Sequence, residues 1–227
     1  MDFHRTPKWD AARDRGMLHE DEAARRDELA DAARNGNWPR VMNIVYRKPN
    51  AWPDTQGWAN AVRLNGKRHY TPLHQAAWHG APVDVVEFLL NNGAWRTLRT
   101  STGQRPVDIA QERGHHHLTR LLQPEIKHRV ASDVVAALQG NLHALMSEYD
   151  EPAPRYLRLP EVGVLTELDP PAYWIRITGG IFAIELRGLE LNVQAIGKMD
   201  YGKHPTFRIT TDGVYDESGR PFPAPQV

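Results

Sequence analysis

The spacing of apolar residues changes near residue 150 of the chain. Before that point, apolar residues recur three and four positions apart, as Leu73 and Ala76 do, which is the spacing of one helix face. After it, the period changes towards two, and residues 172–178 and 181–187 are strand-like runs rich in isoleucine and aromatic residues. The pattern predicts an α+β protein, in which a helical N-terminal part is followed by a small antiparallel β domain.

Residues 70–94 carry the start and stop signals of two short helices. Thr71 can cap the first helix with its hydroxyl, and Pro72 then takes the first helical position, where a missing N–H costs nothing. Gly80 and Gly93 can adopt the left-handed conformation that ends each helix. The segment is therefore predicted to be a helix–turn–helix unit.

The same unit recurs on both sides of this segment. Downstream, Arg105 stands 34 positions after Thr71. Pro106 and Ala110 then stand at the positions that Pro72 and Ala76 occupy in the first segment. Upstream, residues 29–36 match the first-helix half without its Thr-Pro. A recurrence near this period predicts about three stacked repeats that bury a shared core.

The unit resembles the ankyrin repeat, because it contains the run Thr71-Pro72-Leu73-His74-Gln75-Ala76-Ala77. The resemblance implies an N-terminal ankyrin-repeat α-solenoid, in which the His74 imidazole bonds to backbone and to the Thr71 hydroxyl. The order of the parts also resembles bacterial ankyrin-repeat proteins. The predicted parts are a capping helix or arm (1–28), ankyrin repeats (29–124), capping helices (125–149), a linker (150–154) and the β domain (155–227).

The predicted β domain holds about five short strands, close to the usual size of a sheet. Gly179 and Gly180 separate two alternating runs and predict a hairpin turn. Three prolines follow within 221–225, and proline cannot join a central strand. We therefore expect the chain to end in a Pro-rich tail over the surface.

The connection between the first two repeats, residues 46–70, is far longer than the short turn of the consensus. Loops of this length are uncommon inside compact domains and are often functional. The segment is basic and aromatic, and such a surface can bind single strands by charge and by base stacking. Its candidate nucleic-acid contacts are Arg47, Lys48, Trp52, Trp58, Arg63, Lys67 and Arg68.

The resemblance also implies that partners bind on the concave face, formed by the first helix of each repeat and the fingers between repeats. Trp and Arg are enriched at binding hot spots, which makes Trp78 the leading candidate. The alternative is that Trp78 and Trp95 pack against the long loop. The repeat frame also puts Ile109 among the exposed positions. The candidate partner contacts are Gln75, Trp78, His79, Trp95, Arg96, Arg99, Glu112 and Arg113.

The composition of the chain mainly excludes certain classes of function and certain kinds of site. The chain has 28 basic and 28 acidic residues, so its net charge gives no argument for nucleic acid or acidic membranes. It has no cysteine, which removes disulfides, thiol catalysis and thiolate metal sites. We see no signal peptide and no apolar run that could span a membrane, so we expect a cytoplasmic protein.

Candidate chemistry is sparse. His115, His116 and His117 are consecutive, and three successive helical residues cannot face one ion, so we expect neither a metal nor a cofactor. The acidic residues of the β domain suggest no general acid and base pair, and we assign no catalytic residue.

The leading prediction is a non-catalytic adaptor that binds a protein partner on the concave face, with an inhibitor or immunity protein as one specific version. The second hypothesis is nucleic-acid or nucleotide binding through residues 46–70. The third is an enzyme with a site in the β domain.

Overall fold

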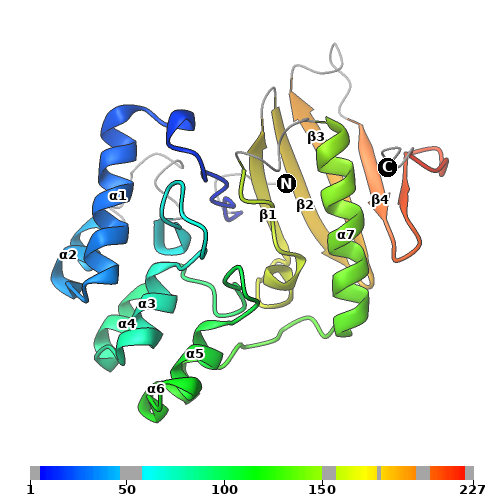
Figure 1. Ribbon diagram of the computed structural model, residues 1–227. Coiled ribbons are helices and arrows are strands. Elements are labelled where there is room, and N and C mark those ends of the chain that lie inside the picture. Colours follow the sequence, from blue (N-terminus) through cyan, green and yellow to red (C-terminus); the bar gives the residue numbers. More distant parts are fainter. Residues whose placement is uncertain (1–5, 47–57, 150–156, 178–179, 198–204, 223–227) are drawn as a thin grey trace. The chain divides into compact units, whose positions relative to one another are not determined.

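The chain divides into two compact units, Ala12–Glu125, and Met1–Ala11 together with Ile126–Val227. The first unit is helical and the second contains an antiparallel sheet, which confirms the α+β class. The computed structural model (Figure 1) describes residues 6–46, 58–149, 157–177, 180–197 and 205–222.

The described part of the helical unit contains three helix pairs and two short 3-10 helices. Its elements are η1 Arg15–Met17, α1 Glu20–Arg34, α2 Trp38–Val45, η3 Trp58–Asn60, α3 Pro72–His79, α4 Val83–Asn91, α5 Pro106–Glu112 and α6 His116–Leu122. The first helices of the pairs, α1, α3 and α5, contact one another in turn, and so do α2, α4 and α6. The unit is therefore a stack of helix pairs in two layers (Figure 1).

The start of α3 depends on a buried hydrogen-bond network around His74. The Thr71 hydroxyl caps the helix by accepting from the His74 backbone N–H at 3.4 Å. His74 Nε2 lies 3.1 Å from the Leu98 carbonyl, which can only accept, so Nε2 carries the proton. Nδ1 is then the acceptor, 2.7 Å from the Thr71 hydroxyl and 3.2 Å from the Thr71 N–H. The network ties the helix start to the segment that follows α4.

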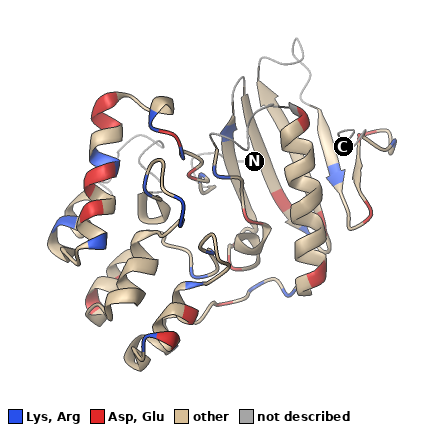
Figure 2. Ribbon diagram, viewed as in Figure 1, with Lys and Arg blue, Asp and Glu red and all other residues tan. Residues whose placement is uncertain are grey.

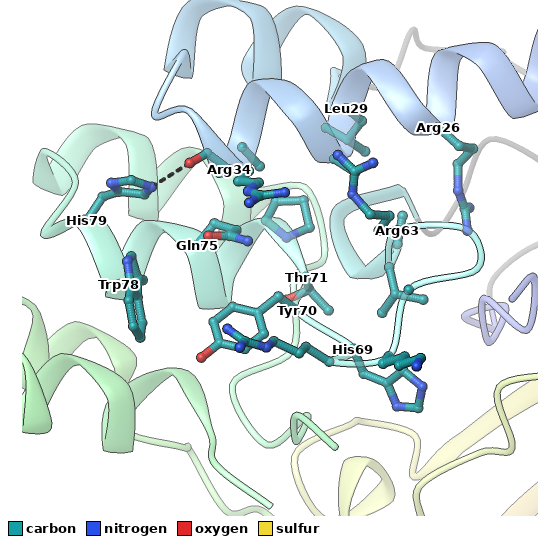
Figure 3. A pocket seen from close by; sticks show the side chains of 18 residues that line it. Arg26, Leu29, Arg34, Arg63, His69, Tyr70, Thr71, Gln75, Trp78 and His79 are labelled. Carbon is teal, nitrogen blue, oxygen red and sulfur yellow. Dashed lines mark hydrogen bonds between the residues drawn. The ribbon is translucent and has the colours of Figure 1, made fainter. Parts of the chain in front are cut away.

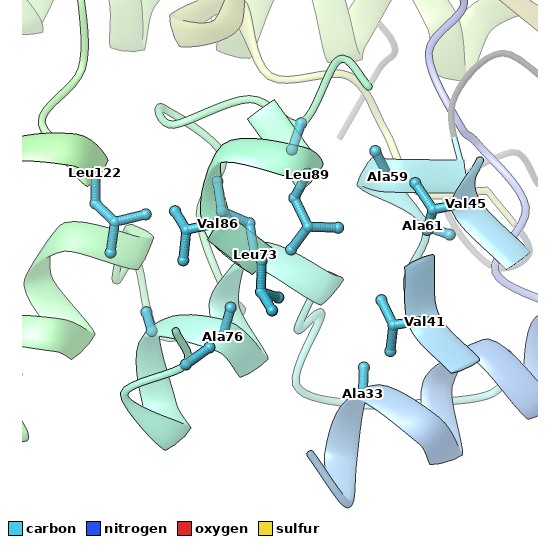
Figure 4. Close-up of a cluster of buried hydrophobic side chains, with 14 of the residues drawn as sticks. Ala33, Val41, Val45, Ala59, Ala61, Leu73, Ala76, Val86, Leu89 and Leu122 are labelled. Carbon is cyan, nitrogen blue, oxygen red and sulfur yellow. The ribbon is translucent and has the colours of Figure 1, made fainter. Parts of the chain in front are cut away.

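Small side chains allow the helix pairs to pack closely. Ala76 and Ala77 of α3 are fully buried, and so is Ala110 of α5. Larger aliphatic side chains fill the space around them, such as Leu89 from the same pair as α3, and Val41 and Leu122 from the neighbouring pairs (Figure 4). Each buried aliphatic side chain contributes about 1.5–3 kcal/mol. Because this cluster runs through all three described pairs, the stability of each pair depends on its neighbours.

Gly80 ends α3 at a point of close contact with the next pair. Its φ of +61° is left-handed, and a Cβ built on it would lie 2.5 Å from His115 Nδ1. The His115 ring is held there because its Nε2 lies 3.2 Å from the Trp78 carbonyl. Gly93, which follows α4, has a φ of +87° but nothing within 4 Å of its Cβ position. The two glycines therefore share a conformation and differ in the space around them.

We predict that Gly80→Ala destabilises the unit more than Gly93→Ala does. Both substitutions put a Cβ on left-handed backbone, at a cost of about 1–2 kcal/mol. Gly80→Ala must also displace the His115 ring, which adds about 1–3 kcal/mol. Chemical denaturation measures both costs. Combining Gly80→Ala with His115→Ala should remove the added part, whereas equal costs for the two single variants would contradict the contact.

Helix α5 begins with a different cap. Arg105 stands at the Thr71 position, and the Asp108 carboxylate accepts from the Arg105 backbone N–H at 2.8 Å and from its guanidinium at 2.9 Å. Partial burial acts to raise the pKa of Asp108, but the hydrogen bonds and the charge of Arg105 outweigh it and lower the pKa below the ordinary value. Ionised Asp108 therefore stabilises the start of α5.

We expect Asp108→Ala to lower the free energy of unfolding by about 1 kcal/mol at neutral pH. Since the folded-state pKa is the lower one, this contribution is complete above the unfolded-state pKa and is lost as the pH falls through the folded-state pKa. Denaturation of the wild type and the variant across a pH series measures the difference. Gln111→Ala, an exposed uncharged position of the same helix, is the control. A difference that stays constant into acid would exclude this role.

Helix α1 begins earlier than the predicted boundary between 1–28 and 29–124. It already starts at Glu20, because Ala23, Arg26 and Leu29 are buried at helical spacing. Much of the predicted capping segment is therefore the first half of α1.

The residues before η1 take part in the sheet unit. The Trp9 N–H donates to the Trp174 carbonyl at 2.7 Å, and the Trp174 N–H donates to the Pro7 carbonyl at 3.0 Å. The Trp9 indole N–H also reaches the Arg158 carbonyl at 2.8 Å. Pairing over such a long separation leaves no local pattern in the sequence, so the sequence suggested an arm instead.

The sheet unit contains five antiparallel strands in the order β1–β2–β3–β4–β5 among its described residues. They are β1 Ala172–Ile177, β2 Gly180–Arg187, β3 Glu190–Gly197, β4 Thr206–Ile209 and β5 Val214–Tyr215. Gly188, with a φ of +63°, makes the tight turn between β2 and β3. The Phe222 N–H donates to the Val214 carbonyl at 2.8 Å, so the tail begins alongside β5. Gly179, the linker at 150–154 and the last prolines lie outside the described residues.

Residues 132–149 form one helix, α7 Ser132–Tyr149, that belongs to the sheet unit and not to the repeat stack. It contacts β4, β5 and the 3-10 helix η4 Val162–Thr166. Leu138, Leu142 and Leu145 are almost fully buried along it, at helical spacing. This differs from the capping helices predicted for 125–149, because the leucine stripe packs in the sheet unit. No helix in the described part is long and apolar enough to cross a membrane.

Candidate functional site

The helical unit contains a pocket of about 500 Å³ lined by α1, by α3 and by the segment 61–72 (Figure 3). One face of α1 lines it, through Arg26, Leu29, Ala30, Ala33 and Arg34. These positions are three and four apart, so the helix presents them together. The pocket therefore lies on the side of the stack formed by the first helices.

The α3 residues predicted to contact a partner lie in this pocket together. Gln75, Trp78 and His79 all line it (Figure 3). His79 Nε2 lies 2.9 Å from the Arg34 carbonyl, which joins the end of α3 to the end of α1. The sequence-based grouping of these three side chains therefore corresponds to one cavity wall.

Trp78 is the leading hot-spot candidate, and 36% of its surface is exposed. The Arg113 guanidinium lies 3.4 Å from the centroid of the indole ring. The Tyr70 ring meets the same indole edge to face, with the centroids 6.2 Å apart. Trp78 thus combines the two arrangements that the sequence left open, because it contacts the end of the long loop and is also accessible.

The pocket is strongly basic. Among the described residues that line it, five are Lys or Arg and none is Asp or Glu. Arg63 forms an ion pair with Asp31 of α1, which is not among the lining residues. The basic residues of the segment between η3 and α3 are blue in Figure 2. They are Arg63, Lys67 and Arg68, while α1 supplies Arg26 and Arg34.

Backbone contacts hold the basic segment in place. Asn65 and His69 adopt left-handed backbone, with φ of 56° and 54°, which is uncommon for residues other than glycine. The Asn65 N–H donates to the Arg13 carbonyl at 2.7 Å, and the Ser101 N–H donates to the Arg68 carbonyl at 3.1 Å. Lys67 is exposed between these two anchor points. The position of the cations is therefore set by the fold of the segment.

A model of the ankyrin repeat family matches residues 68–101, which contain α3, α4 and the segment after them. Residues 68–101 are an ankyrin repeat. The pocket wall formed by α3 is thus the first helix of an ankyrin repeat, and ankyrin repeats generally mediate protein–protein interactions and are typically non-catalytic.

Two curated proteins share sequence similarity with part of the chain. Squamosa promoter-binding-like protein 1 of Arabidopsis thaliana is 35% identical over 74 residues, which is 30% of this chain and 8% of that protein. The E3 ubiquitin-protein ligase Ufd4 of Drosophila melanogaster is 31% identical over 101 residues, which is 42% of this chain and 4% of that protein. The chain matches less than a tenth of the length of either relative.

The finger at 95–99, within the matched repeat, is held by contacts inside the unit. Only 7% of Trp95 is exposed, and its backbone N–H donates to the Asn60 side chain at 2.9 Å, which agrees with the alternative that Trp95 packs against the long loop. The Arg96 guanidinium donates to the Leu121 carbonyl at 2.9 Å and lies 3.4 Å from the Glu125 carboxylate. Arg96 is therefore held by the unit itself.

The remaining predicted contacts are mixed. Arg99 is exposed and its guanidinium bonds to the Gly103 carbonyl at 2.6 Å. Glu112 and Arg113 are exposed at the end of α5, and Arg113 covers Trp78. The expectation that Ile109 is exposed is wrong, because only 1% of its surface is accessible and it joins the core cluster.

The long basic segment splits into two parts. Trp58 is 8% exposed and packs in the core, with the Arg25 guanidinium 5.2 Å from its ring centroid. This burial differs from the expected contact with bases. Arg63, Lys67 and Arg68 line the pocket. The candidates Arg47, Lys48 and Trp52 lie outside the described residues.

Sequence reasoning missed the contribution of α1 to the pocket. Arg26, Ala30 and Arg34 recur at a spacing of four, on the face that carries Leu29 and Ala33. Two cations on the small-residue face of a repeat helix would have indicated a basic concave wall. Tyr70 was also missed as a wall residue, although its position directly before the Thr-Pro cap places it beside α3.

The histidines after α5 contact backbone. His115 Nε2 lies 3.2 Å from the Trp78 carbonyl, and His117 Nε2 lies 3.4 Å from the Ala81 carbonyl. Within the described residues, no three His, Cys, Asp or Glu side chains are arranged as metal ligands would be. The observed contacts give these two imidazoles a role in joining neighbouring helix pairs.

Proposed function

We propose that the helical unit is a non-catalytic adaptor, which binds a protein partner over the pocket and over Trp78. The observation that supports this best is the exposed pair of Trp78 and Arg113 beside a cavity on the first-helix side of an ankyrin repeat. Trp and Arg are the residue types most enriched at binding hot spots.

The arrangement around Trp78 is suited to tight binding because it is already ordered. The indole is fixed between Tyr70 and Arg113, and its helix is capped at both ends by Thr71 and Gly80. A side chain that is immobilised before binding loses less conformational entropy when the partner arrives. The surface therefore presents a rigid aromatic anchor with a cation on top of it.

We further propose that the repeats and the sheet unit are separate binding modules, with the sheet unit as a second contact surface. In this scheme the repeat module extends from α1 to α6, and the second module is the sheet unit, Met1–Ala11 with Ile126–Val227. An inhibitor or immunity protein is one specific version of this adaptor. In that version the partner occupies both binding surfaces, and its activity is thereby inhibited.

We predict that Trp78→Ala weakens binding of the partner by about 1–3 kcal/mol, because it removes the central aromatic anchor. The melting temperature should change little, since the ring lies at the surface. The partner is first isolated by affinity purification from the native host and mass spectrometry, and binding is then measured by calorimetry with purified proteins.

Two variants serve as controls for this experiment. Glu87→Ala removes an exposed side chain of α4, a second-layer helix, and should leave the affinity unchanged. Arg96→Ala should instead lower stability, because it removes the bonds to Leu121 and Glu125. A Trp78→Ala variant that is strongly destabilised yet binds with unchanged affinity when folded would show that Trp78 is a core residue only.

A further inference from the structure

The charge of the pocket indicates the chemistry of its occupant. The whole chain has equal numbers of basic and acidic residues, yet the described lining holds five cations and no acidic side chain. Such a concentration of one sign in a concave site attracts a ligand of opposite charge and disfavours neutral or basic ones. An anionic occupant is therefore the first requirement.

The type of the cations suits carboxylates as the anionic groups. Four of the five are arginines, whose planar guanidinium binds a carboxylate or a phosphate through two parallel hydrogen bonds. The unit already contains one example, because the Asp31 carboxylate pairs with Arg63 at the edge of the pocket. The Asp31 side chain is 59% exposed, so a carboxylate from a partner can take its place in the ion pair with Arg63.

The aromatic residues argue against bases as the occupant. Binding of single strands depends on aromatic rings on which bases can stack. Trp58 is buried in the core, and Arg113 already covers the ring of Trp78. By contrast, Ala30 of the α1 face is a small, partly exposed position over which an aliphatic side chain can lie between the cations.

We propose that this pocket binds an acidic segment of the protein partner, in which Asp or Glu carboxylates meet Arg34, Arg63, Lys67 and Arg68 and an aliphatic side chain lies over the α1 face. The proposal rests on the proposed function and specifies the chemistry of its partner. A volume of about 500 Å³ suits a few residues of such a segment.

The probe for this proposal is a display library of random short peptides, selected on the purified full chain. Selected peptides are then synthesised with a fluorescent label and titrated by anisotropy. A labelled single-stranded oligothymidylate is titrated in parallel. We expect the selected peptides to be rich in Asp and Glu, to carry aliphatic residues, and to bind more weakly as salt increases.

Three variants make the test specific. Lys67→Glu with Arg68→Glu reverses two exposed cations of the pocket and should weaken peptide binding about tenfold. Arg120→Glu with Arg129→Glu makes the same charge change at exposed positions outside the pocket lining and should have little effect. Asp31→Asn removes the competing carboxylate from Arg63 and should strengthen binding severalfold. Circular dichroism establishes that each variant is folded.

Several results would overturn the proposal. Selection of neutral or basic peptides, or no selection at all, would show that the pocket does not take an acidic segment. Acidic peptides that bind equally well to the Lys67→Glu, Arg68→Glu variant would place them elsewhere. Tighter binding of oligothymidylate, lost in that variant, would identify nucleic acid as the occupant. The proposed adaptor function is judged separately, by whether the captured partner depends on Trp78.

Discussion

The close packing of short helices through small side chains is the constraint on which the helical unit depends. Helices of seven to nine residues, such as α3 and α4, are too short to be stable alone and must bury their apolar faces against neighbours. Ala76, Ala77 and Ala110 are fully buried and let the first helices approach one another. This approach also brings the ends of α1 and α3 together, as the bond from His79 to the Arg34 carbonyl shows. The wall of the pocket is thus a product of the same packing that stabilises the stack.

The sequence was most informative where the structure depends on neighbours in the chain. The Thr-Pro start and the glycine end of α3 are local signals, and both have the predicted geometry. The strands β1, β2 and β3 were also visible, because each is a short run rich in β-branched and aromatic or aliphatic residues, bounded in the sequence by glycine. In these segments the chemistry that determines the conformation lies within a few residues of the position concerned.

Prediction failed where a distant part of the chain decides the outcome. Residues 125–149 were expected to cap the repeat stack, but the packing of Leu138 and Leu142 makes α7 part of the sheet unit. Residues near Trp9 looked like a charged arm, and their pairing with Trp174 has no local trace. Similarly, Ile109 was placed among the exposed positions from an average repeat frame, which carries no information on which side chains this core needs to fill.

The same distinction applies to charge. A net charge of zero for the chain gave no argument for nucleic acid or acidic membranes, yet electrostatic attraction depends on where charges lie within about one Debye length, near 8–10 Å. Glu20 and Asp27 of α1 pair with Arg15 near η1, and Asp31 pairs with Arg63 at the edge of the pocket, while the described pocket lining itself contains five cations and no acidic residue. Folding therefore separates charges that are mixed along the sequence. For a repeat protein, the informative quantity is the charge of one helix face taken with the loop that folds beside it, and here that is the face of Arg26 and Arg34.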